Sequence, residues 1–364
     1  MFSILVDFNL TKKIKINKLG IVFRRLTTSE KNMILQQINN IYFKNKKLIN
    51  YAIKNYESKD EMKLSLDLLK YDDVTRKIVM FCFLGFKSGF TFNTPKRIEK
   101  ILDQLIIIDY DKTVLLEFIE EKNVTKLISN LLSLYDIYSA DIKFNEKVRF
   151  DYSFILNDNI LNPDEKDYDI NLIMNIIAKY QQNKLMKKMV EISEEYLLKL
   201  QKFISKLNKD EIRRFLNAID LLYTEHKMIQ NSIISKVTII EGILINEEEE
   251  IKSNYILKAG LIFKHYAKSR SETNNKFIKD FLNYSYEIRS AIIHGNEEKI
   301  PVIFNKVMQK NKYIKQLVHG NIESYNSKKM QAFLLANMIL SLTVRAVIKC
   351  WIDHPSIISF MKNK

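Results

Sequence analysis

The chain has few cysteines, which cross-link small secreted proteins, and few glycines, which form nucleotide-binding loops. Its two cysteines, Cys82 and Cys350, lie far apart and form no C-x-x-C pair. This spacing argues against a disulfide framework or a cysteine-built zinc site and favours a reducing cytosol. Only 7 glycines and 4 prolines are present in 364 residues. Neither G-x-G-x-x-G nor a Walker loop occurs, which excludes nucleotide binding through those loops, and the scarcity of helix breakers favours long helices.

Metal-binding and nucleophile motifs are also missing. No two of the histidines have H-x-x-x-H or H-E-x-x-H spacing, so we expect neither a metal site nor a cofactor. No G-x-S-x-G nucleophile elbow is present. What remains is metal-free acid and base chemistry, for which imidazole suits neutral pH. The five histidines are His226, His265, His294, His319 and His354.

Long hydrophobic runs are absent as well. The longest stretch without a charge, Met330–Val344, has 15 residues, short of the roughly 20 that a membrane-spanning helix needs. Met1–Leu10 contains Asp7 and has neither a basic start nor a small-residue cleavage site, so we interpret it as a strand. No helix pairs a strongly cationic face with an aromatic-rich one. We therefore expect a soluble, cytoplasmic protein with no membrane partner.

Negative charge is scarce relative to positive charge. The chain has 58 Lys and Arg against 43 Asp and Glu, a net charge of +15, with a pI near 9.4. Such a surplus favours a polyanionic partner, of which nucleic acid is the commonest and anionic membrane the second. Residues 1–180 have a net charge of +4 and residues 181–364 a net charge of +11. The second half therefore contains most of the surplus.

The first part of the chain predicts an α+β domain over residues 1–170. Apolar and polar residues alternate over the first 25 positions, which is the period of strands. Thr27-Thr28-Ser29-Glu30 then matches a capping box at the start of a helix. Short apolar runs mixed with turn signals continue to about Leu156. We expect this domain to sense a trigger or inhibitor, or to set specificity.

From about Leu172 the chain predicts an all-helical domain, residues 171–364, so the fold class is mainly α. Asn162-Pro163-Asp164 marks a turn, and we expect the boundary between Leu156 and Met186. Apolar positions recur with helical spacing in each of the later segments. The predicted helices are Glu191–Leu207, Glu211–Ile245, Glu247–Lys268, Glu272–Ile293, Pro301–Val318 and Lys328–Trp351.

His294 has the most unusual setting among the histidines. It falls in the last turn of a helix whose apolar stripe ends at Ile288 and Ile292, and Gly295 occupies the position where a left-handed residue usually ends a helix. Arg289 lies five residues earlier, about 140° around an ideal helix. The two share a face only if the helix end loosens, which Gly295 would permit. The alternative is an ordinary histidine at a helix end.

Arginine and histidine together suit cleavage of RNA without metal. The imidazole can accept the 2′-hydroxyl proton or donate a proton to the leaving 5′-oxygen, while the guanidinium binds the non-bridging phosphate oxygens. One histidine performs only one of those tasks. Two copies of the helix in a homodimer would supply both an acid and a base.

The wider motif, Tyr286-x-x-Arg289-Ser290-x-x-Ile293-His294-Gly295, resembles the signature of the HEPN superfamily, most closely its ApeA-like branch. The run 237–245 with a central Glu241, and the helix around Arg345, resemble neighbouring helices of that branch; Lys258 stands where the branch often has Arg. The likeness covers roughly residues 190–364. It implies a helical fold that dimerises through the motif-bearing helices. It also implies a metal-independent endoribonuclease of a toxin, antiviral-defence or abortive-infection system, with Arg289 and His294 as the R-x4-6-H pair.

Four residues are candidates for supporting roles. Glu241 is one carboxylate in an apolar run, so it needs a cationic partner if it is buried, and Arg289 is our candidate; the alternative is that it faces solvent. Tyr286 either contacts substrate, supports Arg289 or packs in a core or interface. Ser290 belongs to the motif. Asn296 either binds phosphate or forms a turn.

A lysine-rich segment follows the motif. Seven lysines against a single acid, Glu323, lie between residues 299 and 329. We expect this segment to bind RNA. The alternative is that its lysines form a solvated helix face with no partner. The candidate RNA-binding residues are Lys299, Lys306, Lys310, Lys312 and Lys315.

The function that these patterns predict is a metal-independent endoribonuclease with RNA as its partner. The alternative is an RNA-binding or defence-assembly module that has the helical fold and performs no chemistry. A peripheral membrane protein that binds anionic lipid through its lysines is a third and weaker reading.

Overall fold

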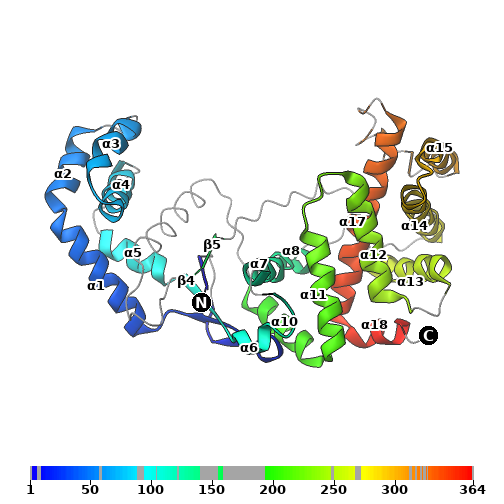
Figure 1. The fold of residues 1–364 in the computed structure, drawn as a ribbon, viewed down its shortest axis with the longest axis horizontal. Helices are drawn as coiled ribbons and strands as arrows, with labels where there is room; N and C mark the ends of the chain where they lie inside the picture. Colours follow the sequence, from blue (N-terminus) through cyan, green and yellow to red (C-terminus); the bar gives the residue numbers. More distant parts are fainter. Residues whose placement is uncertain are drawn as a thin grey trace. The chain divides into compact units, whose positions relative to one another are not determined.

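The computed structural model describes residues 2–5, 10–56, 60–87, 94–103, 105–120, 123–139, 155–158, 193–246, 250–266, 272–310, 314–315, 318–319, 322, 325 and 327–362. The chain divides by its contacts into two compact units. Unit 1 consists of residues 1–129 and 149–201, and unit 2 of residues 130–148 and 202–364. The protein is mostly helical, with a small antiparallel sheet in unit 1 (Figure 1).

This division differs from the single boundary near residue 170 that the sequence suggests. Residues 130–148 belong with the later helices because α8 (Tyr135–Ser139) packs on α17 (Lys328–Asp353). The Lys349 ammonium on α17 donates a hydrogen bond to the Tyr138 carbonyl at 3.1 Å. Unit 1 in turn includes the start of α10 (Glu194–Lys206), where Glu194 accepts a 2.8 Å hydrogen bond from the Thr11 hydroxyl.

The sheet of unit 1 has the strand order β2-β3-β4-β1-β5, and all four pairings are antiparallel. The predicted alternation is confirmed in β2 and β3, where Ile14, Ile16, Ile21 and Phe23 are buried and the residues between them are not. Buried β4 lies at the centre of the sheet and contributes Ile107 to the core. The strands are β1 (Phe2–Leu5), β2 (Ile14–Ile16), β3 (Ile21–Arg25), β4 (Leu105–Tyr110) and β5 (Ile155–Asp158).

A set of helices shares a core with β4 in unit 1. The capping box is present as predicted: Thr27 accepts from the Glu30 backbone at 3.2 Å, and the Glu30 carboxylate accepts from the Thr27 backbone at 2.7 Å. Ile34 and Ile38 of the helix that follows are fully buried, and Ile78 belongs to the same core. The helices of unit 1 begin with α1 (Thr28–Lys44), α2 (Lys46–Asn55), α3 (Glu61–Asp67), α4 (Asp73–Lys87), α5 (Thr94–Leu102) and α6 (Lys112–Leu115).

Unit 2 is a bundle built around α17. This helix contacts α8, α12, α13, α14, α15 and α18, and its most extensive contact is with α12. In Figure 1, α17 and α12 run side by side, with α11 on one side of them and α13, α14 and α15 on the other. The remaining helices are α7 (Val124–Ser133), which spans the division between units, α11 (Lys209–Tyr223), α12 (Ile229–Leu244), α13 (Ile251–Tyr266), α14 (Glu272–Ile293), α15 (Ile300–Lys310) and α18 (Pro355–Lys362).

The prediction of one helix over Glu211–Ile245 is wrong. Helix α11 ends at Tyr223 and α12 begins at Ile229, with Thr224 and Met228 both extended. The Thr224 hydroxyl donates to the Asp220 carbonyl at 2.7 Å and so satisfies an acceptor at the end of α11. The break lets α11 fold back onto α12, which buries apolar faces that one straight helix would expose. Helix α15 covers Ile300–Lys310, and much of the remainder of the predicted Pro301–Val318 lies outside the described residues.

Helix α17 is also the one described helix long and apolar enough to cross a membrane. Within its most apolar 18 residues, 72% are buried inside the protein. Trp351 near its end makes edge-to-face contacts with Phe203 and Phe215, at ring-centre distances of 6.0 and 5.7 Å. Contacts of this kind are those of the central helix of a folded bundle.

Candidate functional site at the end of α14

The motif-bearing helix α14 ends as the sequence predicts. The His294 amide donates to the Ser290 carbonyl at 3.1 Å, so the helix stays regular up to His294. Gly295 then takes the left-handed conformation, with φ of 68°. The Gly295 amide donates to Ile292 at 3.2 Å and the Asn296 amide to Ala291 at 2.8 Å, which is the Schellman pattern. Asn296 therefore has the turn role, one of the two roles considered for it.

Packing against α17 holds this end of α14 in place. Tyr284 and Ile288 are 1% and 0% exposed. The Tyr284 hydroxyl donates to the Ala332 carbonyl of α17 at 2.9 Å. These contacts leave His294, one turn beyond the buried segment, exposed to solvent at the tip of the helix. An exposed imidazole on a rigid helix end is accessible to a large substrate.

Arg289 lies in an ion pair with Glu241 of α12. The guanidinium Nη2 is 3.3 Å from the Glu241 Oε2, and the side chains of Arg289 and Glu241 are 22% and 18% exposed. The predicted partner of Glu241 is therefore confirmed, and the solvent-facing alternative is wrong. The Arg289 guanidinium also lies over the ring of Tyr286, 5.6 Å from its centre. Arg289 is thus held between a carboxylate and an aromatic face.

Tyr286 links this ion pair to the interior of unit 2. Its ring packs 5.2 Å from that of Tyr255 on α13, which is fully buried and whose hydroxyl lies 3.3 Å from the Ser285 hydroxyl. Tyr286 itself is half-buried. The structure therefore gives Tyr286 a packing role and places it against Arg289.

Burial sets the protonation of this cluster. Burial raises the pKa of the Glu241 carboxyl, and the Arg289 charge together with the Tyr286 hydroxyl offsets part of that rise. Burial and the neighbouring Glu241 carboxylate raise the pKa of Tyr286, so its hydroxyl stays protonated at neutral pH. Tyr286 can therefore act as a hydrogen-bond donor beside Glu241 and Arg289.

The cluster is incompletely hydrogen-bonded. Glu241 Oε1 and Arg289 Nε are both buried, and neither has a hydrogen-bond partner within the described part of the chain. A buried donor of a guanidinium without a partner is costly, so such groups usually mark a place for a ligand or water. Arg289 thus retains donor capacity beyond its contact with Glu241, which a phosphate could use.

Arg289 and His294 are not brought together within one chain. Among the described residues no hydrogen bond or ion pair joins them, because the regular helix separates them by about 140°. The loosening that would place both on one face does not occur before Gly295. Ser290 is half-buried between them and accepts the His294 amide bond through its carbonyl.

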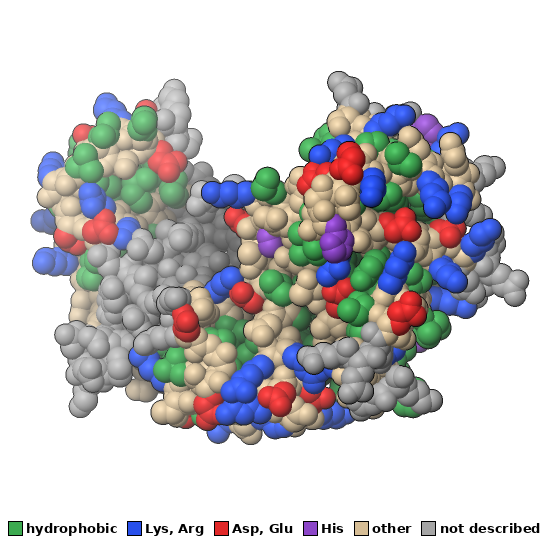
Figure 2. Space-filling view, turned by 45° about the vertical axis from the view of Figure 1, so that its right-hand side comes forward, with side chains coloured by type: hydrophobic (Ala, Val, Ile, Leu, Met, Phe, Trp, Pro, Cys, Tyr) green, Lys and Arg blue, Asp and Glu red, His purple; other side chains and the backbone are tan. Residues whose placement is uncertain are grey.

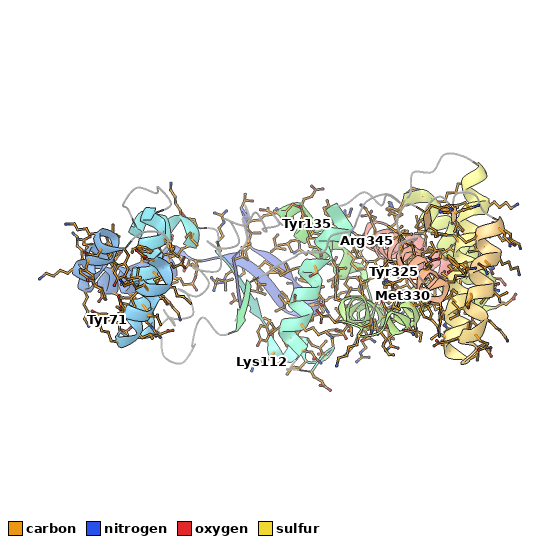
Figure 3. The ribbon with its side chains drawn as sticks, turned by 90° about the horizontal axis from the view of Figure 1, so that it is seen from above. Tyr71, Lys112, Tyr135, Tyr325, Met330 and Arg345 are labelled. Carbon is orange, nitrogen blue, oxygen red and sulfur yellow. The ribbon has the colours of Figure 1, made fainter. Side chains whose placement is uncertain are left out.

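Lys258 is a residue whose place the sequence did not explain. It is 6% exposed on α13, and its ammonium donates to the Leu244 carbonyl at 3.4 Å. A cation at the last carbonyls of α12 stabilises the helix end three residues after Glu241. Arg345 is likewise 6% exposed, on α17 in the core of unit 2 (Figure 3). Both residues are cations at helix positions that the apolar pattern would place in the core. That mismatch is the feature of the sequence that could have identified them.

The lysines that follow the motif are solvent-facing. Lys299 belongs to the short 3-10 helix η5 (Glu297–Lys299) that joins α14 to α15, five residues beyond His294. Glu297 in the same turn pairs with Lys329 at 2.6 Å. Basic and acidic side chains are interspersed on the visible face of unit 2 (Figure 2). Lys299, Lys306, Lys310 and Lys315 are exposed, and Lys312 lies outside the described residues.

No group of three or more His, Cys, Asp or Glu side chains within the described ranges is placed to hold a metal ion.

Comparisons with protein-family models, with curated proteins and with solved structures find no match. The functional assignment of this chain therefore depends on its motif and on the geometry around Arg289.

Proposed function

We propose that the protein is a metal-independent endoribonuclease of the HEPN type, active as a homodimer that brings two α14 helices together. The observation that carries the proposal is the half-buried Arg289, paired with Glu241 and still holding a buried donor without a partner. The motif from Tyr286 to Gly295, the exposed His294 and the adjacent lysines are consistent with it.

In the proposed reaction the 2′-oxygen of RNA attacks the adjacent phosphorus and the bond from phosphorus to the 5′-oxygen breaks. His294 of one chain accepts the 2′-hydroxyl proton, and the second copy of His294 donates a proton to the leaving 5′-oxygen. Arg289 binds the non-bridging oxygens, where charge builds up in the transition state. Glu241 and Tyr286 position Arg289. The products are a 2′,3′-cyclic phosphate and a 5′-hydroxyl end.

The proposed homodimer is supported by the separation of Arg289 and His294 within a single chain. One His294 supplies either the base or the acid, and Arg289 lies on a different side of the same helix. A second α14 lying across the first would place a histidine opposite each arginine. The proposal further places the enzyme in the cytoplasm, in a toxin, antiviral-defence or abortive-infection system, with unit 1 responding to a trigger or inhibitor.

The test is RNA cleavage by wild type, His294→Ala and Arg289→Lys with excess EDTA. We expect wild type to leave cyclic phosphate ends and both variants to lose at least about a hundredfold in rate. His319→Ala is the matched control, because His319-Gly320 repeats the His-Gly pattern without an arginine at the right spacing. Cleavage that EDTA abolishes, or that survives both substitutions, would contradict the proposal.

The alternative is an RNA-binding module without catalysis, favoured by the separation of Arg289 and His294 on α14. It predicts that the wild-type dimer binds RNA and does not cleave it. Cleavage of RNA by wild type distinguishes the two. Cross-linking of a cysteine placed at the exposed Ile293 tests whether the two copies of this helix end come together, as the proposed enzyme requires. If wild type is active and this cysteine never cross-links to its copy, the composite site is wrong.

A further inference from the structure

An open groove lies between α13 and α14. It encloses about 600 Å³ and has an aliphatic floor formed by Ile256, Leu257, Leu261 and Ile278. Gly260 also lines it, and a Cβ added there would make ordinary van der Waals contacts with Leu282 at 3.5 Å and Ile278 at 3.8 Å. Figure 1 shows α13 and α14 at the outer side of unit 2.

Helix α13 is apolar on two sides, and only one of them is covered. Tyr255, Ala259 and Ile262 face the bundle and are 2% exposed or less. On the opposite side Leu257 and Leu261 are 60% and 53% exposed. Two leucines four residues apart form one stripe along a helix. An exposed aliphatic stripe bordering a groove is typical of an interaction surface.

Three lysines surround this aliphatic floor. Lys252 lies at one end of the groove and Lys264 at the other, twelve residues or about 18 Å apart along α13. Lys279 of α14 lies on the far wall, beside Ile278. Lys252 is 3.4 Å from Glu287. Within the described residues, no carboxylate lies within ion-pair distance of Lys264 or Lys279, so the groove keeps a net positive charge.

This combination excludes two occupants. A second copy of the same groove, packed by two-fold symmetry, would place lysines against lysines, which costs free energy. RNA would find ammonium groups for its phosphates, but an aliphatic floor offers no aromatic ring on which bases stack. The occupant must therefore have its own aliphatic side chains and its own negative charges.

We propose that the α13–α14 groove binds an acidic amphipathic helix of a protein partner. Leucine-like side chains of that helix at positions i, i+4 and i+7 would fill the floor between Leu257 and Leu261. Carboxylates on its flanks would pair with Lys264 and Lys279, and the groove length fits about twelve residues. The proposal concerns binding alone and does not rest on the proposed ribonuclease activity.

The experiment measures binding of a fluorescent, stapled 16-residue helical peptide to the full chain by anisotropy. The peptide has leucines at i, i+4 and i+7 with glutamates on both flanks, and a second peptide has lysines in place of the glutamates. We expect the glutamate peptide to bind and the lysine peptide to bind at least about tenfold more weakly. Binding of the glutamate peptide should also weaken as salt rises.

Two paired variants locate the site. Leu257→Glu with Leu261→Glu should weaken binding of the glutamate peptide at least about tenfold, and both positions are exposed enough to leave folding intact. Lys264→Glu with Lys279→Glu should reverse the preference, so that the lysine peptide binds better. Lys206→Glu with Lys227→Glu makes the same change of charge on exposed lysines elsewhere and should change neither affinity beyond the effect of net charge.

Four outcomes overturn the proposal. They are no binding at a peptide concentration of about 1 mM, binding that the leucine variants leave unchanged, displacement of the peptide by single-stranded RNA or by oleate, and conversion of a wild-type dimer to a monomer by the leucine variants. The third would assign the groove to another ligand, and the fourth to a second copy of this chain.

Discussion

The Arg289 guanidinium of α14 lies 3.3 Å from the Glu241 carboxylate of α12, and each group keeps one buried atom without a hydrogen-bond partner in the described part of the chain. The pair joins two helices at a place where a charge without a partner would be costly. It also fixes the position of the arginine on which the proposed RNA chemistry depends.

We expect Glu241→Ala to lower the free energy of unfolding of unit 2 by about 1–3 kcal/mol, because Arg289 is then left half-buried without a counter-charge. Glu241→Gln should cost less. The double variant with Arg289→Ala should cost about 1 kcal/mol less than the sum of the two single variants. Urea unfolding followed by fluorescence of Trp351, the single tryptophan, measures all of them. Additive effects would show that the pair is not energetically coupled.

Gly295→Ala should destabilise unit 2 by about 1–2 kcal/mol. The cost comes from the backbone, whose φ of 68° disfavours an alanine, since no atom lies within 4 Å of the added methyl group. Cleavage should also slow, because Gly295 ends the helix directly after His294. Gly242→Ala is the matched control: it is exposed in α12 with open space around it, and alanine there should stabilise by about 0.5–1 kcal/mol. Equal effects at both positions would contradict this account of Gly295.

Lys236 gives unit 2 a stability that rises with pH. Burial lowers its pKa from 10.5 to about 8, and its ammonium donates to the Asn337 side-chain oxygen at 2.6 Å. Between pH 8 and 10.5 the unfolded chain binds a proton at this lysine that the folded chain does not, so stability increases across that window. The increase over the whole window is about 3 kcal/mol.

Lys236→Met should remove that rise and stabilise unit 2 at pH 7, because the partly buried charge is then absent. Denaturant unfolding at several pH values tests this, with Lys206→Met, at an exposed position, as the control. A pH profile of Lys236→Met that matches wild type would show that another group titrates in this range.

Lys306→Ala and Lys310→Ala test the role of the exposed lysines of α15 in RNA binding. If each contacts a phosphate, each substitution should reduce the slope of log affinity against log salt by about 0.7 for single-stranded RNA. The loss should be the same for different RNA sequences. Lys206→Ala and Lys227→Ala serve as controls of equal charge. If the salt slopes match those of the controls, the lysines of α15 face solvent and do not contact RNA phosphates.

The sequence by itself determined the features that depend on neighbours in the chain. The capping box of Thr27 and Glu30, the strand alternation at Ile14 and Ile16, and the left-handed turn at Gly295 all formed as predicted. Each is decided by local hydrogen bonding, side-chain period or backbone freedom. The pairing of Glu241 with Arg289 was one of two alternatives that the sequence left open, because a carboxylate in an apolar run needs a cation only if it is buried.

Only the tertiary structure decided how these elements combine. No glycine or proline marks the break between Tyr223 and Ile229, which exists because α11 folds back onto α12. Leu261 and Ile262 are equally apolar in the sequence, yet one is 53% exposed and the other 2%. An apolar side chain is stabilised by burial, but its hydrophobicity does not determine which neighbouring element covers it. That choice came from the packing of α13 against α14 and α17, which left the other face of α13 open.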